Sequence, residues 1–573
     1  MSPARGKVEV LEEFRSWADV VKRIRRNIQR QRTEDWETLR WKEYQRNVYR
    51  LQKRIYRAAR QGDWRRVHKL QRLLLRSWSA RCLAVRRVSQ EDRGKRTAGV
   101  DGVKNLTFRQ RMRLARGLAD LAQWRVAPIR RTYIPKRGTR ERRGLGIPVM
   151  ADRACQALVK LALEPEWEAQ FEPNSYGFRP GRSVHDAIEA IFKAICSKPK
   201  YVLEADIEKC FDRINHEALL KKLKAIQPIM RLVGGWLKAG IVDEGETIFP
   251  EAGTPQGGVI SPLLANIALH GFERAIEAVN RRHRIIVIRY ADDFVVLCED
   301  LETLLTVKEE AARWLGKMGL RLKTAKTRVT HTLNEYEGRA GFDFLGFHVR
   351  QYRGGKYRTR TYRGEPGFKT LITPSGKGVK RHTGKVKDIV HRYRGAPQTA
   401  LITMLNPVVR GWTNYYRTCV AKRTFNKMDR LMYRKLMGWA AHRHPNRTAR
   451  WRFRRYWRRQ GLRMVFSDGK HTLNGYAEVP IIRHVKVQNE RSPYDGDWVY
   501  WGTRLGRDPT RPGRVIWLLK QQQGRCGDCG LPLTTEDVLE IHHRDGDRSN
   551  ERRANLVLLH AHCHDRTHAG LYH

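Results

Sequence analysis

A chain of 573 residues is too long for one hydrophobic core, so three or more domains are expected. Its 114 Lys and Arg residues outweigh 59 Asp and Glu residues, and the formal net charge of +55 predicts a polyanionic partner. Charge alone would also fit a ribosomal-type scaffold protein, but an apolar content of 40% excludes wholesale disorder. No apolar run approaches membrane-spanning length and the first residues lack the core of a signal peptide, so a soluble, intracellular protein is expected.

The N-terminal region, residues 1–98, has a basic helical pattern. Arg, Leu and Trp recur at helical spacing between residues 8 and 90, which predicts two or three amphipathic helices. These helices could follow a nucleic-acid backbone, although ordinary solvated faces account for most of the arginines. A Gly-rich stretch at 94–103 then predicts a new domain from residue 99.

Residues 99–350 alternate between strand and helix patterns, which predicts an α+β domain. The expected elements are extended segments at 133–135 and 145–148 around a basic loop, a helix at 185–198, a strand at 201–207 and a hairpin at 289–298.

The C-terminal part divides into four stretches by composition. Residues 351–385 have little apolar content and predict a linker, and residues 386–445 predict a helical block. Residues 446–515 are basic and aromatic and are expected to bind DNA, and residues 516–573 form a small unit rich in Cys and His. Six apolar residues of the helical block recur at helical spacing and predict a packing face: Phe425, Met428, Leu431, Met432, Leu436 and Trp439.

Two acidic residues are expected at the tip of the 289–298 hairpin. Asp292 and Asp293 stand between two apolar runs, where like charges repel unless a cation such as Mg²⁺ offsets them. Polar turn chemistry would explain an Ala-Asp-Asp sequence that stood alone. The strand at 201–207, however, brings a third carboxylate, Asp206, to a neighbouring strand end. Three such carboxylates could hold the two metal ions that a polymerase needs.

The order of motifs along the chain supports this interpretation. TYIPKRG, RRGLGIP, SYGFRPGRS, EADIEKCFDRINH, GTPQGGVISPLLANI, RYADDFVVL, GLRLKTAKT and FDFLGF follow one another between about Gly99 and His348. In this order they resemble the blocks of group II intron-encoded reverse transcriptases. The resemblance implies a right-hand polymerase, with fingers and palm at 99–350. It also implies a helical thumb, or X domain, at 386–445, where NPVVRGWTNYYR is similar to intron maturases.

The resemblance also implies roles for individual residues. Asp206 and Asp292 would bind both Mg²⁺ ions, and Asp293 would contribute to the ion on the primer side. The carbonyl of Ile207 could add a ligand. Lys326 would lie near the pyrophosphate as a possible general acid.

The expected nucleotide site extends into the fingers. Lys136 and either Arg142 or Arg143 would contact the triphosphate, and the choice stays open because RRGLGIP has Gly where the family usually has Pro. Phe211 corresponds to the aromatic residue that excludes a 2′-hydroxyl, although without the motif it would be interpreted as a core Phe. Gln256 would line the nucleotide and template site.

Three aromatic residues of the expected thumb have two interpretations. Trp412, Tyr415 and Tyr416 could stack on RNA bases, or they could pack helices together. Packing is the favoured interpretation for each.

The last fifty residues contain two pairs of metal-binding residues. Cys526 and Cys529 form a C-x-x-C pair, and His560 and Cys563 form a second pair with the same spacing. Two such pairs predict a closed structural Zn²⁺ site, which would supply folding energy to a unit too small for a large core.

A second set of residues in this unit resembles the ββα-metal site of HNH endonucleases. The resemblance implies that His543 is the general base, that His542 and His564 hold a catalytic divalent ion, and that Asn555 fixes the loop bearing the base. A zinc knuckle that only binds DNA would need neither the double His nor Asn555.

The two resemblances predict a multifunctional protein of a mobile element, located in the bacterial cytoplasm with the nucleoid. It would bind its group II intron RNA and assist splicing. In intron retrohoming it would nick a double-stranded DNA target and use dNTPs to copy the RNA from the new 3′ end. Two alternatives stay open: a maturase that only binds RNA, and a reverse transcriptase co-opted for defence or diversity generation.

Overall fold

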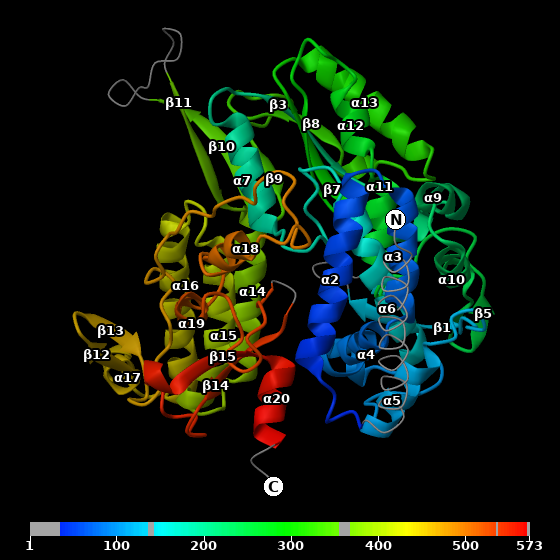
Figure 1. Ribbon diagram of the computed structural model, residues 1–573. Coiled ribbons are helices and arrows are strands. Elements are labelled where there is room, and N and C mark those ends of the chain that lie inside the picture. Colours follow the sequence, from blue (N-terminus) through cyan, green and yellow to red (C-terminus); the bar gives the residue numbers. More distant parts are fainter. Residues whose placement is uncertain (1–34, 136–141, 355–366, 535–536, 570–573) are drawn as a thin grey trace, which may run out of the picture.

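The computed structural model describes residues 35–135, 142–354, 367–534 and 537–569, which form three hydrophobic cores (Figure 1). The largest core runs from Trp36 to Val329. The domain boundary expected at residue 99 therefore does not separate two cores. The Gly-rich stretch is a loop, and the residues before and after it pack into the same core. Within the described ranges, no helix combines the length and the apolar character needed to span a bilayer.

Helices at the N-terminal end cover one side of the largest core. They are α2 (Trp41–Arg60), α3 (Trp64–Arg76), α4 (Trp78–Arg86), η1 (Arg87–Glu91), η2 (Arg93–Arg96) and α5 (Phe108–Gly117), with α6 (Met150–Glu168) beneath them. Tyr44, Val48 and Ile55 are buried at helical spacing in α2, which leaves its arginines on the outer face. The amphipathic helices predicted for this region are confirmed in its described part.

A small sheet carries the basic loop. Its strands are β1 (Ile129–Pro135), β2 (Arg142–Ile147), β4 (Ile241–Asp243) and β5 (Glu246–Ile248). Their order is β2-β1-β4-β5, with β1 antiparallel to β2 and parallel to β4. Both predicted extended segments are confirmed.

The central sheet is antiparallel and lies between two cores. Its strands are β3 (Tyr201–Asp206), β6 (Ile286–Tyr290), β7 (Asp293–Cys298) and β8 (Arg328–His331), in the order β6-β7-β3-β8. Phe294 and Val296 of β7 enter the first core, whereas Val295 and Leu297 enter the second, because successive side chains of a strand point to opposite faces. The predicted strand, hairpin and helix are confirmed here.

Helices surround the central sheet and short elements connect its strands. They are α7 (Val184–Ile195), α8 (Cys210–Arg213), α9 (His216–Leu223), α10 (Gln227–Lys238), α11 (Ser261–Leu269), α12 (Phe272–Glu277), α13 (Leu301–Gly316) and η3 (Thr324–Lys326).

A third sheet and three long helices form the next layer. They are β9 (Phe342–Phe344), β10 (Phe347–Arg353), β11 (Phe368–Pro374), α14 (Gly376–Arg392), α15 (Gln398–Tyr416) and α16 (Lys422–Arg443). The linker expected over 351–385 is wrong for the described residues, because β11 pairs with β10 and α14 begins at Gly376. The apolar content of 351–385 is low because the residues that α14 buries within this range, Gly378 and His382, carry no hydrophobic side chain. The packing face predicted on α16 is confirmed, with Leu431 partly buried.

Residues 446–515 do not form one segment, contrary to expectation. Their elements are α17 (Ala449–Tyr456), β12 (Trp457–Gln460), β13 (Arg463–Phe466), α18 (Trp498–Leu505) and the start of α19 (Gly513–Gln521). The first three lie at the edge of the molecule (Figure 1), whereas the chain after them returns to contact α7 and α2. There His484 Nε2 lies 3.1 Å from Asp186 Oδ1, and Tyr49 donates a hydrogen bond to the Pro493 carbonyl.

The third core belongs to the C-terminal unit. Its later elements are β14 (Leu539–His543), η4 (Arg553–Asn555), β15 (Leu556–His560) and α20 (Ala561–Ala569). The core already includes Leu505 and Leu518, so the unit begins before residue 516.

Candidate functional site

Three aspartates meet where β3 and the β6–β7 hairpin end. Asp206 is the last residue of β3 and pairs with Asp293, the first residue of β7. Asp292 lies in the two-residue turn, where Ala291 adopts a φ of +58°. The amide of Ile207 donates a hydrogen bond to the Asp292 carbonyl at 3.1 Å. The register of the sheet therefore gathers the three carboxylates predicted from sequence at one edge.

The charges of these carboxylates are only partly compensated. Burial, together with the charges of Asp292 and Asp206, raises the pKa of Asp293 to about 7. Burial and the charge of Asp206 also raise the pKa of Asp292. The ammonium of Lys326 lies 2.6 Å from Asp206 Oδ2, and although burial opposes it, this contact raises the pKa of Lys326. Crowded carboxylate oxygens with excess negative charge suit hard divalent cations.

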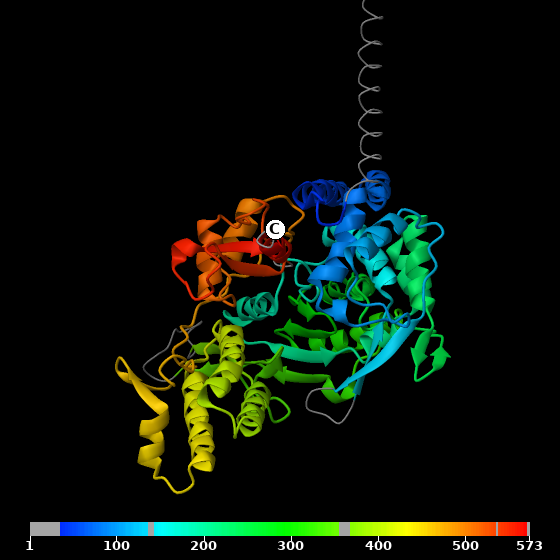
Figure 2. The same ribbon diagram turned by 90° about the horizontal axis from the view of Figure 1, so that it is seen from below.

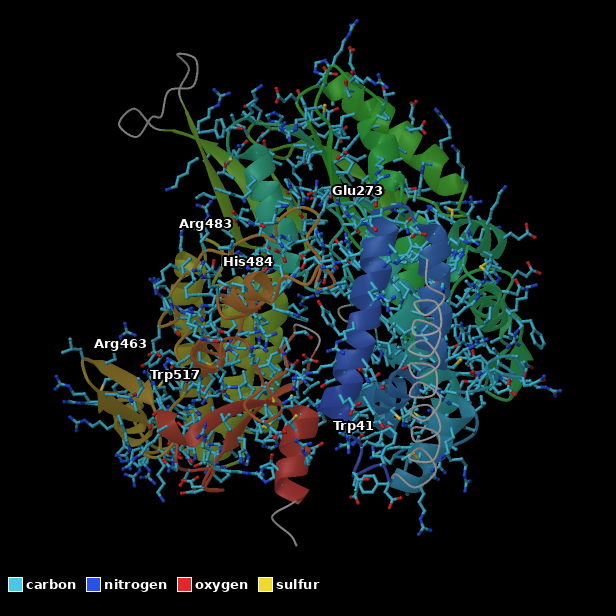
Figure 3. The ribbon with its side chains drawn as sticks, in the orientation of Figure 1. Trp41, Glu273, Arg463, Arg483, His484 and Trp517 are labelled. Atoms are coloured by element: carbon cyan, nitrogen blue, oxygen red, sulfur yellow. The ribbon has the colours of Figure 1, made fainter. Side chains whose placement is uncertain are left out.

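A buried guanidinium lies beneath the turn, at the first position of the motif RYADDFVVL, to which the sequence analysis assigns no role. Arg289 has 0% exposure, and its Nη1 donates to Asn266 Oδ1 at 3.1 Å and to the Ala291 carbonyl at 3.3 Å. Its Nη2 donates to Ser175 Oγ at 2.7 Å, and its Nε lies 3.7 Å from Oε1 of Glu273, which is labelled in Figure 3. The only signal in the sequence is a charged residue inside the apolar run that precedes the two aspartates. Arg289 thus holds the main chain of the turn from below.

Phe211 lies beside the carboxylates with a second aromatic ring. It is partly buried, and its ring meets Phe178 edge-on with centroids 6.1 Å apart. Phe178 is half-exposed and adopts a φ of +59°, a conformation rare for aromatic residues, so the backbone of this segment holds its ring beside the site. The sequence motif contains Phe178, but nothing in it indicates this pairing.

The Pro-Gln-Gly-Gly loop packs against β2. The Gln256 carbonyl accepts a hydrogen bond from the Gly146 amide at 2.7 Å. Gly257 adopts a φ of +120°, and a Cβ there would lie 2.6 Å from the Gly146 carbonyl oxygen. Only glycine allows this close approach, which connects the loop bearing Gln256 to the basic strand.

The two candidate arginines of β2 differ in their surroundings. As consecutive strand residues, Arg142 and Arg143 point to opposite faces. The positive charge of Arg143 acts on the carboxyls of Asp292 and Asp212 and favours their ionised forms. Arg143 therefore faces the carboxylates. Lys136 lies outside the described residues.

The three thumb aromatics make contacts within the fold. Tyr415 donates a hydrogen bond to the Leu345 carbonyl at 2.7 Å, and Tyr416 donates to the Gly346 carbonyl at 3.0 Å. The Trp412 ring stacks on His382 with centroids 4.7 Å apart. These contacts favour the packing interpretation.

The C-terminal unit brings four buried side chains together. The ligand atoms of Cys526, Cys529, His560 and Cys563 all lie within 4.8 Å of one another, in an arrangement that could hold a metal ion. His560 Nδ1 lies 3.4 Å from Cys529 Sγ, and its other ring nitrogen lies 3.6 Å from Asp537 Oδ2. A carboxylate on the far side of a ligating histidine fixes the ring and its tautomer.

A second cluster in this unit contains three histidines. Ligand atoms of His542, His564 and His568 also lie within 4.8 Å of one another, and His564 Nδ1 lies 2.7 Å from Glu540 Oε2. The resemblance to HNH endonucleases does not point to His568, although its spacing of four residues after His564 places both on one face of α20. The cluster stands on β14 and α20.

The neighbouring residues His543 and Asn555 flank this cluster. The Asn555 side chain donates to Asp545 Oδ1 at 2.8 Å and to the Asn550 carbonyl at 2.9 Å, which ties together the loop that follows His543. His543 Nε2 is buried and has no hydrogen-bond partner among the described residues.

Comparison with known protein families matches three consecutive parts of the chain. The N-terminal domain of reverse transcriptase matches residues 36–118, and the reverse transcriptase (RNA-dependent DNA polymerase) family matches residues 134–349. The maturase-specific domain of group II introns matches residues 379–457.

Three curated relatives each match between about half and two thirds of the chain. Protein YkfC of Escherichia coli is 31% identical over 342 residues, which cover 52% of this chain and 87% of that protein. The group II intron-encoded protein LtrA of Lactococcus lactis is 29% identical, over 53% of this chain and 63% of its own length. Maturase-like protein 1 of Euglena gracilis is 26% identical, over 66% of this chain and 76% of its own. Among solved structures, a telomerase from Candida tropicalis matches with a TM-score of 0.30 at 15% identity, over 39% of this chain and 53% of that one, too distant to bear on the fold.

Proposed function

Because the chain belongs to the family of group II intron-encoded reverse transcriptases and maturases, we propose that it copies its intron RNA into DNA, assists splicing and nicks a DNA target. The central sheet lies in an RNA-directed DNA polymerase domain. In intron retrohoming, the DNA strand cut by the C-terminal unit would provide the 3′ end that this polymerase domain extends.

The three aspartates carry the polymerase proposal. Two Mg²⁺ ions held by Asp206, Asp292 and Asp293 would supply activation of the primer hydroxyl and charge neutralisation of the triphosphate. Lys326 Nζ, 2.6 Å from Asp206, would carry the proton that the departing pyrophosphate accepts. Arg143 would bind the triphosphate, since its charge faces the same carboxylates.

Selection of the nucleotide would depend on aromatic and polar side chains around the carboxylates. Phe211 would occupy the space that a 2′-hydroxyl needs, and Phe178 would restrict the movement of its ring. Gln256 would meet the templating base pair, on a loop held against β2. The carbonyl of Ile207 could contribute a further metal ligand.

The gathering of three carboxylates by the sheet register is the observation that carries this part, and Asp292→Asn tests it. This variant should lose primer extension on an RNA template yet retain RNA affinity, because the basic surface is unchanged. Asp120→Asn, at an exposed position away from the sheet, is the matched control and should extend normally. Measurable extension by Asp292→Asn at saturating Mg²⁺ would contradict the metal assignment.

We further propose that the C-terminal unit is an HNH endonuclease stabilised by Zn²⁺. Cys526, Cys529, His560 and Cys563 would hold the structural zinc, because four buried Cys and His ligand atoms are the set that Zn²⁺ prefers. Asp537 supports this assignment, since it faces the ring nitrogen of His560 that points away from the cysteines.

The histidine cluster would be the nuclease site. His542, His564 and His568 would hold a divalent ion, which would stabilise the leaving 3′-oxygen. His543 would accept the proton of the attacking water, since its buried Nε2 has no partner among the described residues. Asn555 would hold the adjoining loop.

Two variants separate the structural metal from the catalytic one. Cys529→Ser should lose bound zinc and DNA nicking, whereas His543→Ala should keep zinc and lose nicking alone. Both should still extend a supplied primer, because the strands that carry the palm carboxylates pack into the other two cores. His283→Ala, an exposed histidine outside this unit, is the control. Nicking by His543→Ala at the wild-type rate would leave only a DNA-binding knuckle, and loss of primer extension would contradict the separation of the two sites.

A further inference from the structure

An isolated hairpin at the edge of the molecule has no part in either proposed site. Residues 449–466, called here the hairpin unit, comprise α17 and the β12–β13 ribbon. Both views show the unit at the edge of the molecule, beside α16 and away from the central sheet (Figures 1 and 2). Only its base packs against the body, so its outer end is available to a partner.

The base of the hairpin unit is firmly packed. Trp457 and Phe466 pair across the ribbon, are 6% and 3% exposed, and meet edge-on with centroids 5.0 Å apart. Phe453 stacks on Trp457 at 5.3 Å, and Trp439 of α16 meets Phe466 at 5.7 Å. An aromatic base of this kind holds the ribbon in one orientation relative to the thumb helices.

The tip of the ribbon presents a leucine to solvent. Gln460 pairs with Arg463, so Gly461 and Leu462 form a two-residue turn. Gly461 adopts a φ of +59°, which fits a glycine at the first central position of a tight hairpin turn. Leu462 is 97% exposed, the highest value among the large apolar side chains of the described residues. Met464, also exposed, follows two residues later.

The flanks of this leucine are strongly basic. Residues 449–463 contain seven arginines and no acidic residue. Six of the seven are exposed: Arg450, Arg454, Arg455, Arg458, Arg459 and Arg463. Arg463, labelled in Figure 3, lies 3.5 Å from Glu478, but both side chains are largely exposed, so this ion pair is weak. Such a basic surface attracts phosphate groups. It does not attract a protein surface that has few acidic residues.

We propose that the hairpin unit binds double-stranded DNA and inserts Leu462 between two base pairs from the minor groove. This inference rests on the proposed DNA target. Apolar wedges flanked by arginines unstack a base step in this way and kink the duplex, and phosphate contacts on both sides offset the cost of unstacking. Duplex RNA fits less well, because its minor groove is wide and shallow and is recognised mainly through hydroxyl and phosphate contacts. A kinked, unstacked step would help the cut strand leave its complement and reach the palm.

The test uses the full chain and duplex DNA of the insertion site, with 2-aminopurine placed at successive positions to report unstacking. Wild-type protein should raise the fluorescence at one or two adjacent steps. Leu462→Ala should reduce this rise to near the value of free DNA and change affinity little, because phosphate contacts dominate binding. Leu73→Ala, which removes another exposed leucine on α3, should behave as wild type.

The arginines are tested separately. Arg459→Gln combined with Arg463→Gln should weaken duplex binding and lower the log–log salt slope by about two units, one for each phosphate that the protein no longer neutralises. An unchanged fluorescence rise in Leu462→Ala would overturn the wedge, and an unchanged salt slope would overturn the phosphate contacts. A change in RNA affinity alone would assign the unit to the intron instead.

Failure of this inference and failure of the proposed function are distinguishable. If wild-type protein binds and nicks the duplex but no step unstacks, the wedge is wrong and the endonuclease proposal stands. If it neither binds nor nicks the duplex, the DNA target itself is wrong.

Discussion

Replacement of Arg289 should separate catalytic positioning from stability. This guanidinium is fully buried beneath the Asp292 turn and donates to Asn266, Ser175 and the Ala291 carbonyl. Lysine keeps the charge but lacks the planar fork that reaches three acceptors, and methionine removes both.

The magnitude follows from these contacts. A buried hydrogen bond from a charged donor contributes about 1.5–3 kcal/mol, and breaking a buried charge network costs roughly 3–5 kcal/mol. Arg289→Lys should therefore destabilise the protein by about 3 kcal/mol, and Arg289→Met by about 4 kcal/mol. Without the donor to the Ala291 carbonyl the turn shifts, and a displacement of ~1 Å at the reacting groups lowers the rate roughly 100-fold.

The assay is single-nucleotide incorporation at saturating dNTP, at a temperature where every variant is folded by circular dichroism. Leu74 of α3 is fully buried and lies away from the turn. Leu74→Ala should lower the free energy of unfolding by about 2–5 kcal/mol and therefore serves as the control for stability alone. Leu74→Ala should incorporate at the wild-type rate, whereas Arg289→Lys should lose kcat with little change in the KM for dNTP. If folded Arg289→Lys incorporates at the wild-type kcat, the guanidinium is only structural.

Three further predictions concern other parts of the chain. Phe211→Val should admit ribonucleotides, and unchanged discrimination between dNTP and rNTP in single incorporations would make Phe211 a core residue. Burial raises the pKa of Glu166 from 4.5 to about 7, so the stability that its neutral form contributes below pH 4.5 is lost as the pH rises through 7. Glu166→Gln should therefore be more stable than wild type by about 3 kcal/mol at pH 8 and equal to it at pH 4, in thermal unfolding; parallel pH profiles would contradict this. RNA affinity should fall steeply with salt, and a flat log–log plot would mean that the net charge of +55 serves another purpose.

Much of the site can be predicted from sequence because its signals are local. Short, nearly continuous apolar runs predict β3 and the β6–β7 hairpin, and the aspartates at the ends of these runs then lie at one edge of the sheet. The paired Cys526 and Cys529 predict a metal ligand set in the same way, since their spacing sets their geometry. His568 carries an equally local signal, because it stands four residues after His564 on a helix.

Two predictions about domain boundaries are wrong: the linker at 351–385 and the new domain at residue 99. The first segment contains a helix whose buried face has few hydrophobic side chains, and the second is a glycine-rich loop beside a core. The part of α14 that ends at Lys385 buries only Gly378 and His382, so its composition is that of a linker. The Gly-rich stretch near residue 99 has the composition of a domain boundary, although the chain on both sides of it enters one core.

By itself, then, the sequence determined the strand and helix patterns, the acidic strand ends and the metal-binding pairs, because each depends on neighbours within a few residues. Only the tertiary structure decided that Arg143 rather than Arg142 faces the carboxylates, that Phe178 meets Phe211, and that Arg289 holds the turn through Ser175. Ser175 and Arg289 are 114 residues apart. Contacts of that range depend on how the cores pack, and no local pattern encodes them.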